Sequence, residues 1–388
     1  MKAYVLEADW APKEGYTPTE REINDKRAIR SDMVYRNMKA GLKDTADPRP
    51  GPRDVLFKVG ACGICGSDMH AGAMGPDFYT KYAGHLKLPV ITGHEISGEV
   101  VEIGKEVTGF RPGDIVTVEQ IRPCGICDAC KTGYFNSCRN IEEVGLSVDG
   151  GFSEYILVPE HYCYCINDIA EALGNRAAAF EAGALAEPIG VAYNGIFVRG
   201  RGITPGAHVA VFGVGPIGLS AVALARRSGA AKVIAIDVNE DRLQLAKLVG
   251  ADLTVNPSLL GGSVSEAVIE MTSGLGCKVV VEAAGAPEAT YPEIVKLMSI
   301  GANVVAIGRS PKLAPMDIER FISKNCSLSG SMGTSGSDII PSVLRMMASG
   351  LDMRKIITGR FSLYDIPEVI EEVKGGSHGK VLISQFYD

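Results

Sequence analysis

The feature that most constrains the fold is the segment "VAVFGVGPIGLSAVALARRSGAAKVIAIDV", which runs from Val209 to Val238. It begins as an apolar strand, passes through a glycine-rich turn, continues as a helical stretch and ends as a second apolar strand. Strands that alternate with helices in this way are typical of a parallel sheet covered by helices. We therefore expect an α/β fold in this part of the chain.

The glycine-rich turn has the spacing of a dinucleotide-binding site. Gly213 permits a tight turn, Gly215 lets the backbone approach a pyrophosphate, and Gly218 lets the helix pack closely on the strand. Asp237 ends the second strand, where a carboxylate accepts hydrogen bonds from a ribose 2′-hydroxyl and repels the 2′-phosphate of NADP. A glycine turn alone recurs by chance, but the strands, helix and acid together predict bound NAD. The residues predicted to contact NAD here are Gly213, Gly215, Pro216, Ile217, Gly218, Asp237 and Arg242.

Length and strand pattern predict two domains. A chain of 388 residues is long for a single hydrophobic core. In the first half, short strands bounded by Gly and Pro indicate a small, irregular β domain. From about 191 to 331, apolar strands alternate with helical stretches. The segment between 9 and 53 is polar and charged without a clear period, and we interpret it as a surface excursion.

Composition argues against two classes of partner. The net charge is -7 with no sustained basic stretch, which argues against nucleic acid. One long uncharged run, 207–225, is interrupted by glycines and Pro216, so it predicts a strand, turn and helix rather than a membrane span. The opening "MKAYVLEADW" lacks the apolar run of a secretory peptide. Ten cysteines without such a peptide predict a cytoplasmic protein whose clustered cysteines bind metal.

The stretch "CGICDACKTGYFNSC" predicts a structural metal site. Four thiolates so close in sequence match a closed tetrahedral zinc site that holds a loop. An iron–sulfur cluster is the alternative, although its usual run has a shorter final gap followed by proline, where this chain has Arg139. Four cysteines without metal are the remaining possibility. The predicted zinc ligands are Cys124, Cys127, Cys130 and Cys138.

A second cluster, "ACGICGSDMH", is compatible with a redox pair, a structural metal clip or one corner of a catalytic metal site. Cys62 and Cys65 have the spacing of a redox pair, but no βαβ unit surrounds them. Farther along the chain, "GHEISGE" offers His94 and Glu95, and "ALAEPIG" offers Glu187. Separate segments would then supply sulfur, nitrogen and oxygen ligands and leave a fourth position for water or substrate, as a catalytic zinc requires.

Together these motifs resemble the zinc-dependent medium-chain alcohol dehydrogenases. "GICGSDMH", "GHEISGEVVEIG", "CGICDAC" with Cys138, "LAEPIGVAYN" and "GVGPIG" stand in that family's order and approximate spacing, across nearly the whole chain. The resemblance implies a GroES-like β-rich catalytic domain at 1–192 and 333–388, around a Rossmann domain with a doubly wound parallel sheet at 193–332. It also implies a homodimer or homotetramer joined through the coenzyme domain, and we expect "NVVAIG", 303–308, at the sheet edge of that contact.

The same resemblance implies the ligands of a catalytic zinc. Cys65, His94 and Glu187 would bind the metal, while Cys62 packs beside it. In these enzymes Glu95 either ligates or hydrogen-bonds the metal, so the two carboxylates can exchange. With the four-cysteine loop, the resemblance implies two zinc ions per chain.

A proton relay and one further cofactor contact are also implied. Ser67 would contact the substrate oxygen, and His70 would be the outer member of the relay, a role that suits a side chain with a pKa near 6.5. Asp68 would orient the imidazole of His94. Lys380 would meet the pyrophosphate. The residues implied to take part in catalysis are Ser67, His70 and Glu95.

The implied activity is NAD-dependent oxidation of an alcohol. Ethanol-type members of the family carry a cysteine where Glu187 stands, whereas the sorbitol and polyol branch shares the carboxylate, which can accept a hydrogen bond from a neighbouring hydroxyl. The "EADW" opening and the 9–53 segment resemble the inosose (keto-inositol) dehydrogenases. We therefore expect hydride transfer from a secondary alcohol of a polyol, sugar or cyclitol, such as sorbitol or an inosose, which gives a ketone. The alternatives are an amino-alcohol dehydrogenase of the L-threonine 3-dehydrogenase type and a non-enzymatic relative that binds NAD and zinc.

Overall fold

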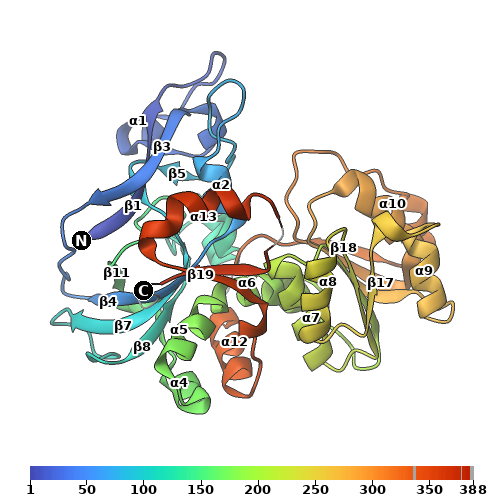
Figure 1. The fold of residues 1–388 in the computed structure, drawn as a ribbon. Helices are drawn as coiled ribbons and strands as arrows, with labels where there is room; N and C mark the ends of the chain where they lie inside the picture. The colour runs from blue at the N-terminus through green and yellow to red at the C-terminus, as the bar shows by residue number, and fades with distance from the viewer. Residues whose placement is uncertain (335–337, 377, 385–388) are drawn as a thin grey trace. The chain divides into compact units, whose positions relative to one another are not determined.

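The computed structural model describes residues 1–334, 338–376 and 378–384. The chain divides into two compact units, each built from more than one stretch of sequence (Figure 1). The β-rich unit comprises Met1–Glu187, Gly359–Gly376 and the chain from Val381. The parallel-sheet unit comprises Pro188–Thr358 and a short return that ends at Lys380.

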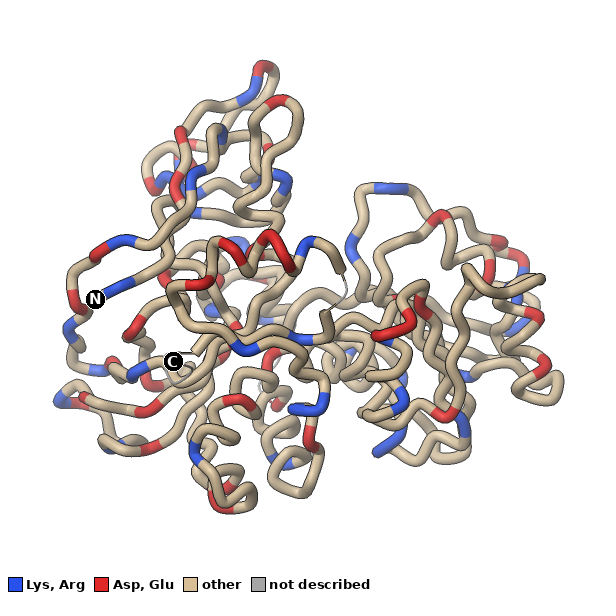
Figure 2. Tube along the Cα trace, in the orientation of Figure 1, with Lys and Arg blue, Asp and Glu red and all other residues tan. Residues whose placement is uncertain are grey.

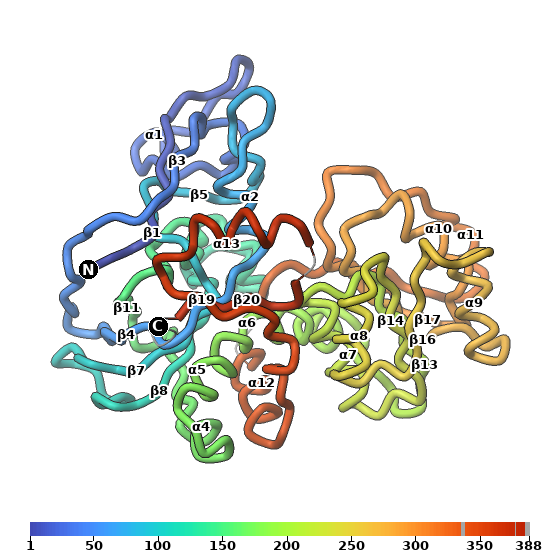
Figure 3. Tube along the Cα trace, in the orientation of Figure 1, coloured from blue at the N-terminus to red at the C-terminus, as the bar shows by residue number. Residues whose placement is uncertain are grey.

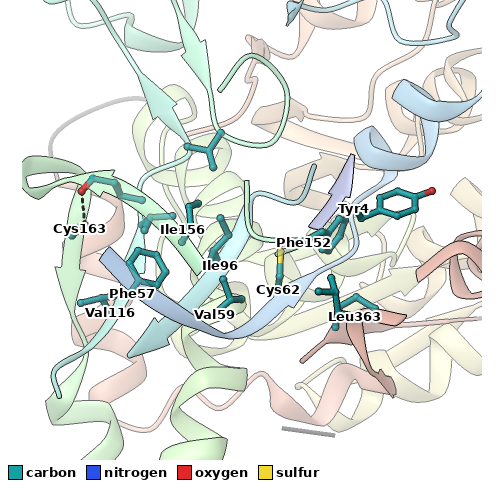
Figure 4. Packing of buried hydrophobic residues seen from close by; sticks show 14 of the residues in the cluster. Tyr4, Phe57, Val59, Cys62, Ile96, Val116, Phe152, Ile156, Cys163 and Leu363 are labelled. Atoms are coloured by element: carbon teal, nitrogen blue, oxygen red, sulfur yellow. Dashed lines mark hydrogen bonds between the residues drawn. The ribbon is translucent and has the colours of Figure 1, made fainter. Parts of the chain in front are cut away.

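A seven-stranded sheet organises the β-rich unit. Its strands follow the order β12-β8-β7-β4-β20-β19, and β11 pairs with β4. β4 is buried almost throughout, because α5 covers it so closely that a Cβ on Gly60 would lie 2.4 Å from the ring of Phe180. Phe57, Ile96 and Phe152 lie in the main core of the unit (Figure 4). The bounds of these elements are β4 Asp54–Gly63, β7 Glu95–Ile103, β8 Ile115–Val118, β11 Tyr155–Pro159, β12 Cys163–Cys165, α5 Arg176–Ala184, β19 Ile357–Phe361 and β20 Lys380–Ile383.

The segment between 9 and 53 was predicted as a surface excursion, and this is wrong for its central part. Tyr35 and Met38 are buried with Tyr82 and Leu86 in a second core. The pattern concealed this core because its apolar residues stand at irregular intervals among charged ones. A three-stranded sheet of order β3-β1-β6 carries it, with β1 at Lys2–Trp10, β3 at Tyr35–Asp44 and β6 at Val90–Ile91. Its short elements are α1 Glu20–Asp25, β2 Arg27–Ala28, η1 Ser31–Met33 and β5 Leu86–Lys87.

The remaining elements of the β-rich unit are short. The cysteine-rich loop contains β9 Ile121–Arg122, α3 Asp128–Lys131, η2 Phe135–Ser137 and β10 Glu142–Glu143. The others are α2 Gly66–Gly72, η3 Glu160–Tyr162, α4 Asn167–Leu173, η7 Leu363–Asp365 and α13 Ile366–Val373. α13 is amphipathic, because it buries Ile366 and Val369 and exposes the acidic residues that Figure 2 shows along its turns. α6, Ala186–Tyr193, leads from this unit into the next.

Six parallel strands in the order β15-β14-β13-β16-β17-β18 form the parallel-sheet unit (Figure 3). The predicted strand, turn, helix and strand are present as β13 His208–Phe212, α7 Pro216–Arg227 and β14 Lys232–Ile236, which confirms the α/β class and the doubly wound sheet. The order reverses between β13 and β16, and such sheets bind ligands beyond the carboxyl ends of the strands at that point. The other bounds are η4 Asn194–Arg199, α8 Glu240–Leu248, β15 Leu253–Val255, η5 Pro257–Leu259, α9 Val264–Met271, β16 Cys277–Glu282, α10 Pro287–Leu297, β17 Met298–Ala306, α11 Ile318–Ser323, β18 Ser327–Gly330, α12 Ile339–Ala348 and η6 Arg354–Ile356.

Two predictions about this unit differ from the structure. The segment 303–308 does not provide a sheet edge, because β18 pairs along β17 from Asn303 to Ala306 and itself ends the sheet. The chain also returns to the β-rich unit at 359 rather than at 333. α12 stays with the parallel-sheet unit because it packs on α6, where a Cβ on Gly190 would lie 3.2 Å from Ile340.

No helix in the described ranges is both long enough and apolar enough to cross a membrane.

Candidate active site

Three predicted metal ligands come together in the β-rich unit. Cys65 caps the N-terminus of α2, His94 immediately precedes β7, and Glu95 begins that strand. Each residue offers one ligand atom, and these atoms all lie within 4.8 Å of one another. His94 and Glu95 are 2% and 1% exposed, whereas Cys65 is half-buried. The group therefore has a partly open side at its sulfur.

Asp68 fixes two of these ligands in place. Its Oδ2 accepts a hydrogen bond of 2.9 Å from the backbone N–H of Cys65, and its Oδ1 accepts one of 3.2 Å from Gly93. Nδ1 of His94 lies 3.6 Å from Asp68 Oδ1, which leaves Nε2 on the side of Cys65 and Ser67. Burial lowers the pKa of His94, but the negative charges of Asp68 and Cys65 outweigh it and raise the pKa well above its ordinary value. The same field attracts a metal cation.

Gly63 makes room for the Glu95 carboxylate, a role that the sequence analysis missed. The two residues are register partners on β4 and β7, and a Cβ on Gly63 would lie 2.0 Å from Oε2 of Glu95. The "CGIC" motif contained this signal, since a glycine in a strand often marks the close approach of another group. Cys62, one residue earlier, is fully buried in the main core and does not belong to the metal group.

Glu187 does not join this group. It lies in the first turn of α6 and is 7% exposed, but among the described residues it belongs to no cluster of three ligand atoms within 4.8 Å. The structure thus places Glu95, rather than Glu187, beside Cys65 and His94.

The predicted relay residues share one helix. Ser67 and His70 stand three positions apart on α2, so their side chains lie on the same side of it. Ser67 is half-buried, with its Oγ 3.5 Å from Nε2 of His94, and His70 is exposed. The proton relay between these two residues stays a prediction.

The donor set of Cys65, His94 and Glu95 fits zinc. One thiolate, one imidazole and one carboxylate are ligand types that zinc accepts, and three protein ligands leave a position for an exchangeable fourth. Within the described ranges, the buried Nδ1 of His94 has no hydrogen-bond partner within 3.5 Å. The charge of Asp68 therefore orients the imidazole from its Nδ1 side, and Nε2 is the nitrogen that could bind a metal ion.

The four-cysteine loop forms the second metal group. The Sγ atoms of Cys124, Cys127, Cys130 and Cys138 all lie within 4.8 Å of one another. Cys127 Sγ is 3.5 Å from Cys130 Sγ and 3.9 Å from Cys138 Sγ. Zinc–sulfur bonds of 2.3 Å in a tetrahedron place sulfurs about 3.8 Å apart, so one ion fits this group. A multi-iron cluster would need wider spacing, because its core stands between the thiolates.

The pKa values of these thiols also favour a bound cation. Backbone amides of Cys130 and Arg139 lower the pKa of Cys127 to about 6, which favours its thiolate. Burial, together with hydrogen bonds to the thiols of Cys127 and Cys138, raises the pKa of Cys130 to about 12. Four adjacent thiolates cannot all ionise without a positive charge nearby. A divalent metal supplies that charge.

The glycine turn in the parallel-sheet unit has the geometry that a dinucleotide needs. Gly213 adopts φ +79°, and a Cβ on Gly218 would lie 1.9 Å from the carbonyl oxygen of Gly213, so helix and strand pack as predicted. Gly215 caps α7, and a Cβ there would meet nothing within 4 Å. Oδ2 of Asp237 accepts a 2.8 Å hydrogen bond from the N–H of Val214, which ties the acid to the turn.

The other predicted cofactor residues lie close to this turn or to the return at 378–380. Pro216 and Ile217 form the first turn of α7, where proline needs no N–H partner. Nε of Arg242, on α8, donates a 3.2 Å hydrogen bond to the carbonyl oxygen of His378. Lys380 is 1% exposed and begins β20, so it is not a solvated surface lysine. Contact of these residues with NAD stays a prediction.

Two family models match the chain. Residues 51–168 match the alcohol dehydrogenase GroES-like domain, and residues 216–349 match the zinc-binding dehydrogenase domain. A solved structure from Thermotoga maritima, assigned as an alcohol dehydrogenase, superposes with a TM-score of 0.94 at 37% identity and covers 99% of each chain.

Curated relatives span several alcohol substrates. The scyllo-inosose 3-dehydrogenase of Thermotoga maritima is 38% identical over 96% of this chain and 97% of its own. The L-threonine 3-dehydrogenase of Symbiobacterium thermophilum is 34% identical over 90% and 97%, respectively. A probable D-xylulose reductase A of Neosartorya fischeri is 33% identical over 87% and 91%.

Proposed function

Because the chain belongs to the zinc-dependent medium-chain alcohol dehydrogenases, we propose that it oxidises a secondary alcohol of a cyclitol, sugar or linear polyol to a ketone. It is an oxidoreductase whose cofactors are NAD and zinc. The proposal concerns the substrate class, and an inosose or a related cyclitol is the preferred substrate. The relatives give no support to the non-enzymatic alternative.

The observation that carries this proposal is the similarity to a scyllo-inosose 3-dehydrogenase, which is 38% identical over 96% of this chain. A probable D-xylulose reductase A at 33% identity supports the same substrate class. Glu187, the carboxylate from which the sequence predicts a polyol, lies outside the metal group and therefore does not carry the substrate class.

The residues of this chain would divide the reaction among them. Bound zinc supplies a Lewis acid that lowers the pKa of an alcohol hydroxyl. Ser67 would take up the hydroxyl proton as it releases its own, and His70 would be the outer member of the relay, where its exposed ring can exchange a proton with water. Asp68 would hold His94 in one orientation. NAD, bound at the Gly213–Gly218 turn, would accept the hydride.

A panel of alcohols tests the substrate class. NADH formation by the zinc-loaded protein would be followed with inositols, inososes, sorbitol, xylitol, glucose, butanediol, threonine and ethanol. We expect a polyhydroxylated substrate to exceed ethanol in kcat/KM by about 100-fold or more, since each productive hydrogen bond at the site contributes to the transition state. A clear preference for ethanol would contradict the proposal.

The L-threonine 3-dehydrogenase type is the second candidate, and the 34% identity to such an enzyme favours including it. The same panel separates the two. If threonine gives the highest kcat/KM, the polyol assignment is wrong and the assignment as a zinc dehydrogenase is unaffected.

Assembly and compartment complete the proposal. We propose a homo-oligomer joined at the outer edge of β18, which has no neighbouring strand in the described part of the sheet. Leu328 on this strand and Ile318 and Ile322 on α11 are exposed and apolar. We also propose that the protein resides in the reducing cytoplasm, where cysteines clustered as in the four-cysteine loop bind metal.

A further inference from the structure

Glu282 is a buried carboxylate for which neither the metal groups nor the proton relay has a use. It is 1% exposed and ends β16. Its register partner is Phe212, the last residue of β13, so it lies at the reversal point of the sheet. Burial raises its pKa, and backbone N–H groups that bind the carboxylate act in the opposite direction. Burial of a carboxyl group costs free energy of folding unless its oxygens accept hydrogen bonds. The hydrogen-bond partners of Glu282 therefore indicate its role.

The partners belong to the loop that follows β16. Oε1 of Glu282 accepts hydrogen bonds from the N–H groups of Ala284 at 3.2 Å and Gly285 at 3.0 Å. The hydroxyl of Thr290, on α10, lies 3.4 Å from the same oxygen. One carboxylate oxygen thus closes the loop onto the end of its own strand.

The second carboxylate oxygen lies against the next strand connection. A Cβ on Gly308 would be 2.5 Å from Oε2 of Glu282, and Gly308 donates its N–H to the Glu282 carbonyl at 2.9 Å. The loop after β16 and the loop after β17 therefore meet at this side chain.

The same loop supports the dinucleotide turn. A Cβ on Gly213 would lie 2.5 Å from the backbone of Ala284, so the two loops are in direct contact. The N–H of Ala283 donates a 2.8 Å hydrogen bond to the carbonyl oxygen of Phe212. Displacement of Ala284 would therefore shift or crowd the first glycine of the turn.

We propose that Glu282 is a positioning residue for NAD, which sets the place of the phosphate-binding turn by holding the Ala284 loop against Gly213. The inference rests on the proposed location of NAD at that turn. Glu282 touches neither metal group, so its effect falls on cofactor affinity rather than on the chemical step.

The test compares cofactor binding and turnover in the zinc-loaded protein. Glu282→Ala removes the acceptor for two loop amides, and we expect the Kd for NADH, measured by fluorescence titration, to rise about tenfold or more. The KM for NAD should rise with it, while kcat at saturating NAD stays within about threefold. Glu282→Gln keeps one carbonyl oxygen for the amides and should restore the Kd to within about threefold of the parent protein.

The test includes a matched control variant and a second variant that disturbs the same loop. Glu293, on α10, also accepts a backbone N–H, that of Ser265 at 2.7 Å, but lies outside these loops, so Glu293→Ala should leave the Kd unchanged. If Glu282→Ala does not fold, Gly308→Ala places a Cβ 2.4 Å from the backbone nitrogen of Gly285 and 2.5 Å from Oε2 of Glu282. It therefore displaces the same loop and should also weaken NADH binding.

Three results would overturn the inference. If Asp237→Ser weakens NADH binding but folded Glu282→Ala and Gly308→Ala do not, the positioning role is wrong and the location of NAD stands. Equal losses in Glu282→Ala and Glu282→Gln would show that the hydrogen-bond acceptor is not what matters. If Asp237→Ser also leaves binding unchanged, the proposed location of NAD fails together with the inference.

Discussion

At the scale of single residues, two buried carboxylates compete for one role. Glu95 lies within 4.8 Å of the ligand atoms of Cys65 and His94, whereas Glu187 lies in α6 outside that cluster. Glu95 is held by strand pairing opposite Gly63, so it can reach the metal without any rearrangement of the backbone. The geometry therefore favours Glu95 as the carboxylate ligand.

Substitution of each carboxylate distinguishes them. Glu95→Gln is expected to lower the zinc content from two ions to about one per chain and to reduce kcat by about 100-fold or more, because a ligand is lost. Glu187→Gln is expected to keep both ions. Zinc would be counted by atomic emission in parallel with kcat measurements. If only Glu187→Gln loses zinc, Glu187 rather than Glu95 is the carboxylate ligand.

We expect Asp237 to determine the choice between NAD and NADP. Both of its carboxylate oxygens are held by backbone N–H groups, those of Val214 and Asn239 at 2.8 and 3.0 Å. A fixed negative charge there repels a 2′-phosphate more strongly than a mobile one would. We expect NAD to give the higher kcat/KM, and Asp237→Ser to narrow the difference by about tenfold or more, mainly through a higher KM for NAD. A preference for NADP in the parent protein would contradict this.

At the scale of elements, the sequence predicts local patterns well and long-range pairing poorly. The strand, turn and helix around Gly213 follow from glycine spacing and apolar periodicity, which are local. The edge strand was misplaced because β18, "SLSG", contains one large apolar residue and gives almost no strand signal. The choice between Glu95 and Glu187 depends on the register of β4 and β7, which links residues 32 positions apart, Gly63 and Glu95. Such pairings are set by the whole fold.

The exposed edge of β18 makes a prediction about assembly. Leu328 is 43% exposed on this strand, and a charge there should disfavour an apolar contact between copies. We expect light scattering to show an oligomer for the parent protein and a smaller species for Leu328→Asp. Leu259, 74% exposed after β15 at the opposite edge of the sheet, gives the control Leu259→Asp, which should not change the mass. A monomeric parent protein would refute the proposed oligomer.

At the scale of the whole molecule, the two metal groups place different demands on the fold. The cysteine-rich loop has a small core, whose buried residues are Ile121, Cys130, Cys138 and Ile141. A bound metal would therefore contribute much of the stability of this loop. The catalytic group instead stands on β4, β7 and α2, beside a main core that includes Phe57, Ile96 and Phe152. Its loss of metal should therefore leave the fold of the β-rich unit intact.

Graded removal of zinc tests this difference. With three protein ligands and an exchangeable fourth position, the Cys65 group should release its ion to a chelator before the closed four-cysteine group does. We expect activity to fall to near zero while about one zinc per chain and the far-UV circular dichroism remain, and added zinc to restore activity. Stronger chelation should then remove the second ion and lower the thermal unfolding temperature, because the loop between β9 and β10 loses its support. If activity and the unfolding temperature fall together from the first equivalent of chelator, the two metal groups are not independent. If the fully active protein holds only one zinc ion, one of the two metal groups does not bind zinc.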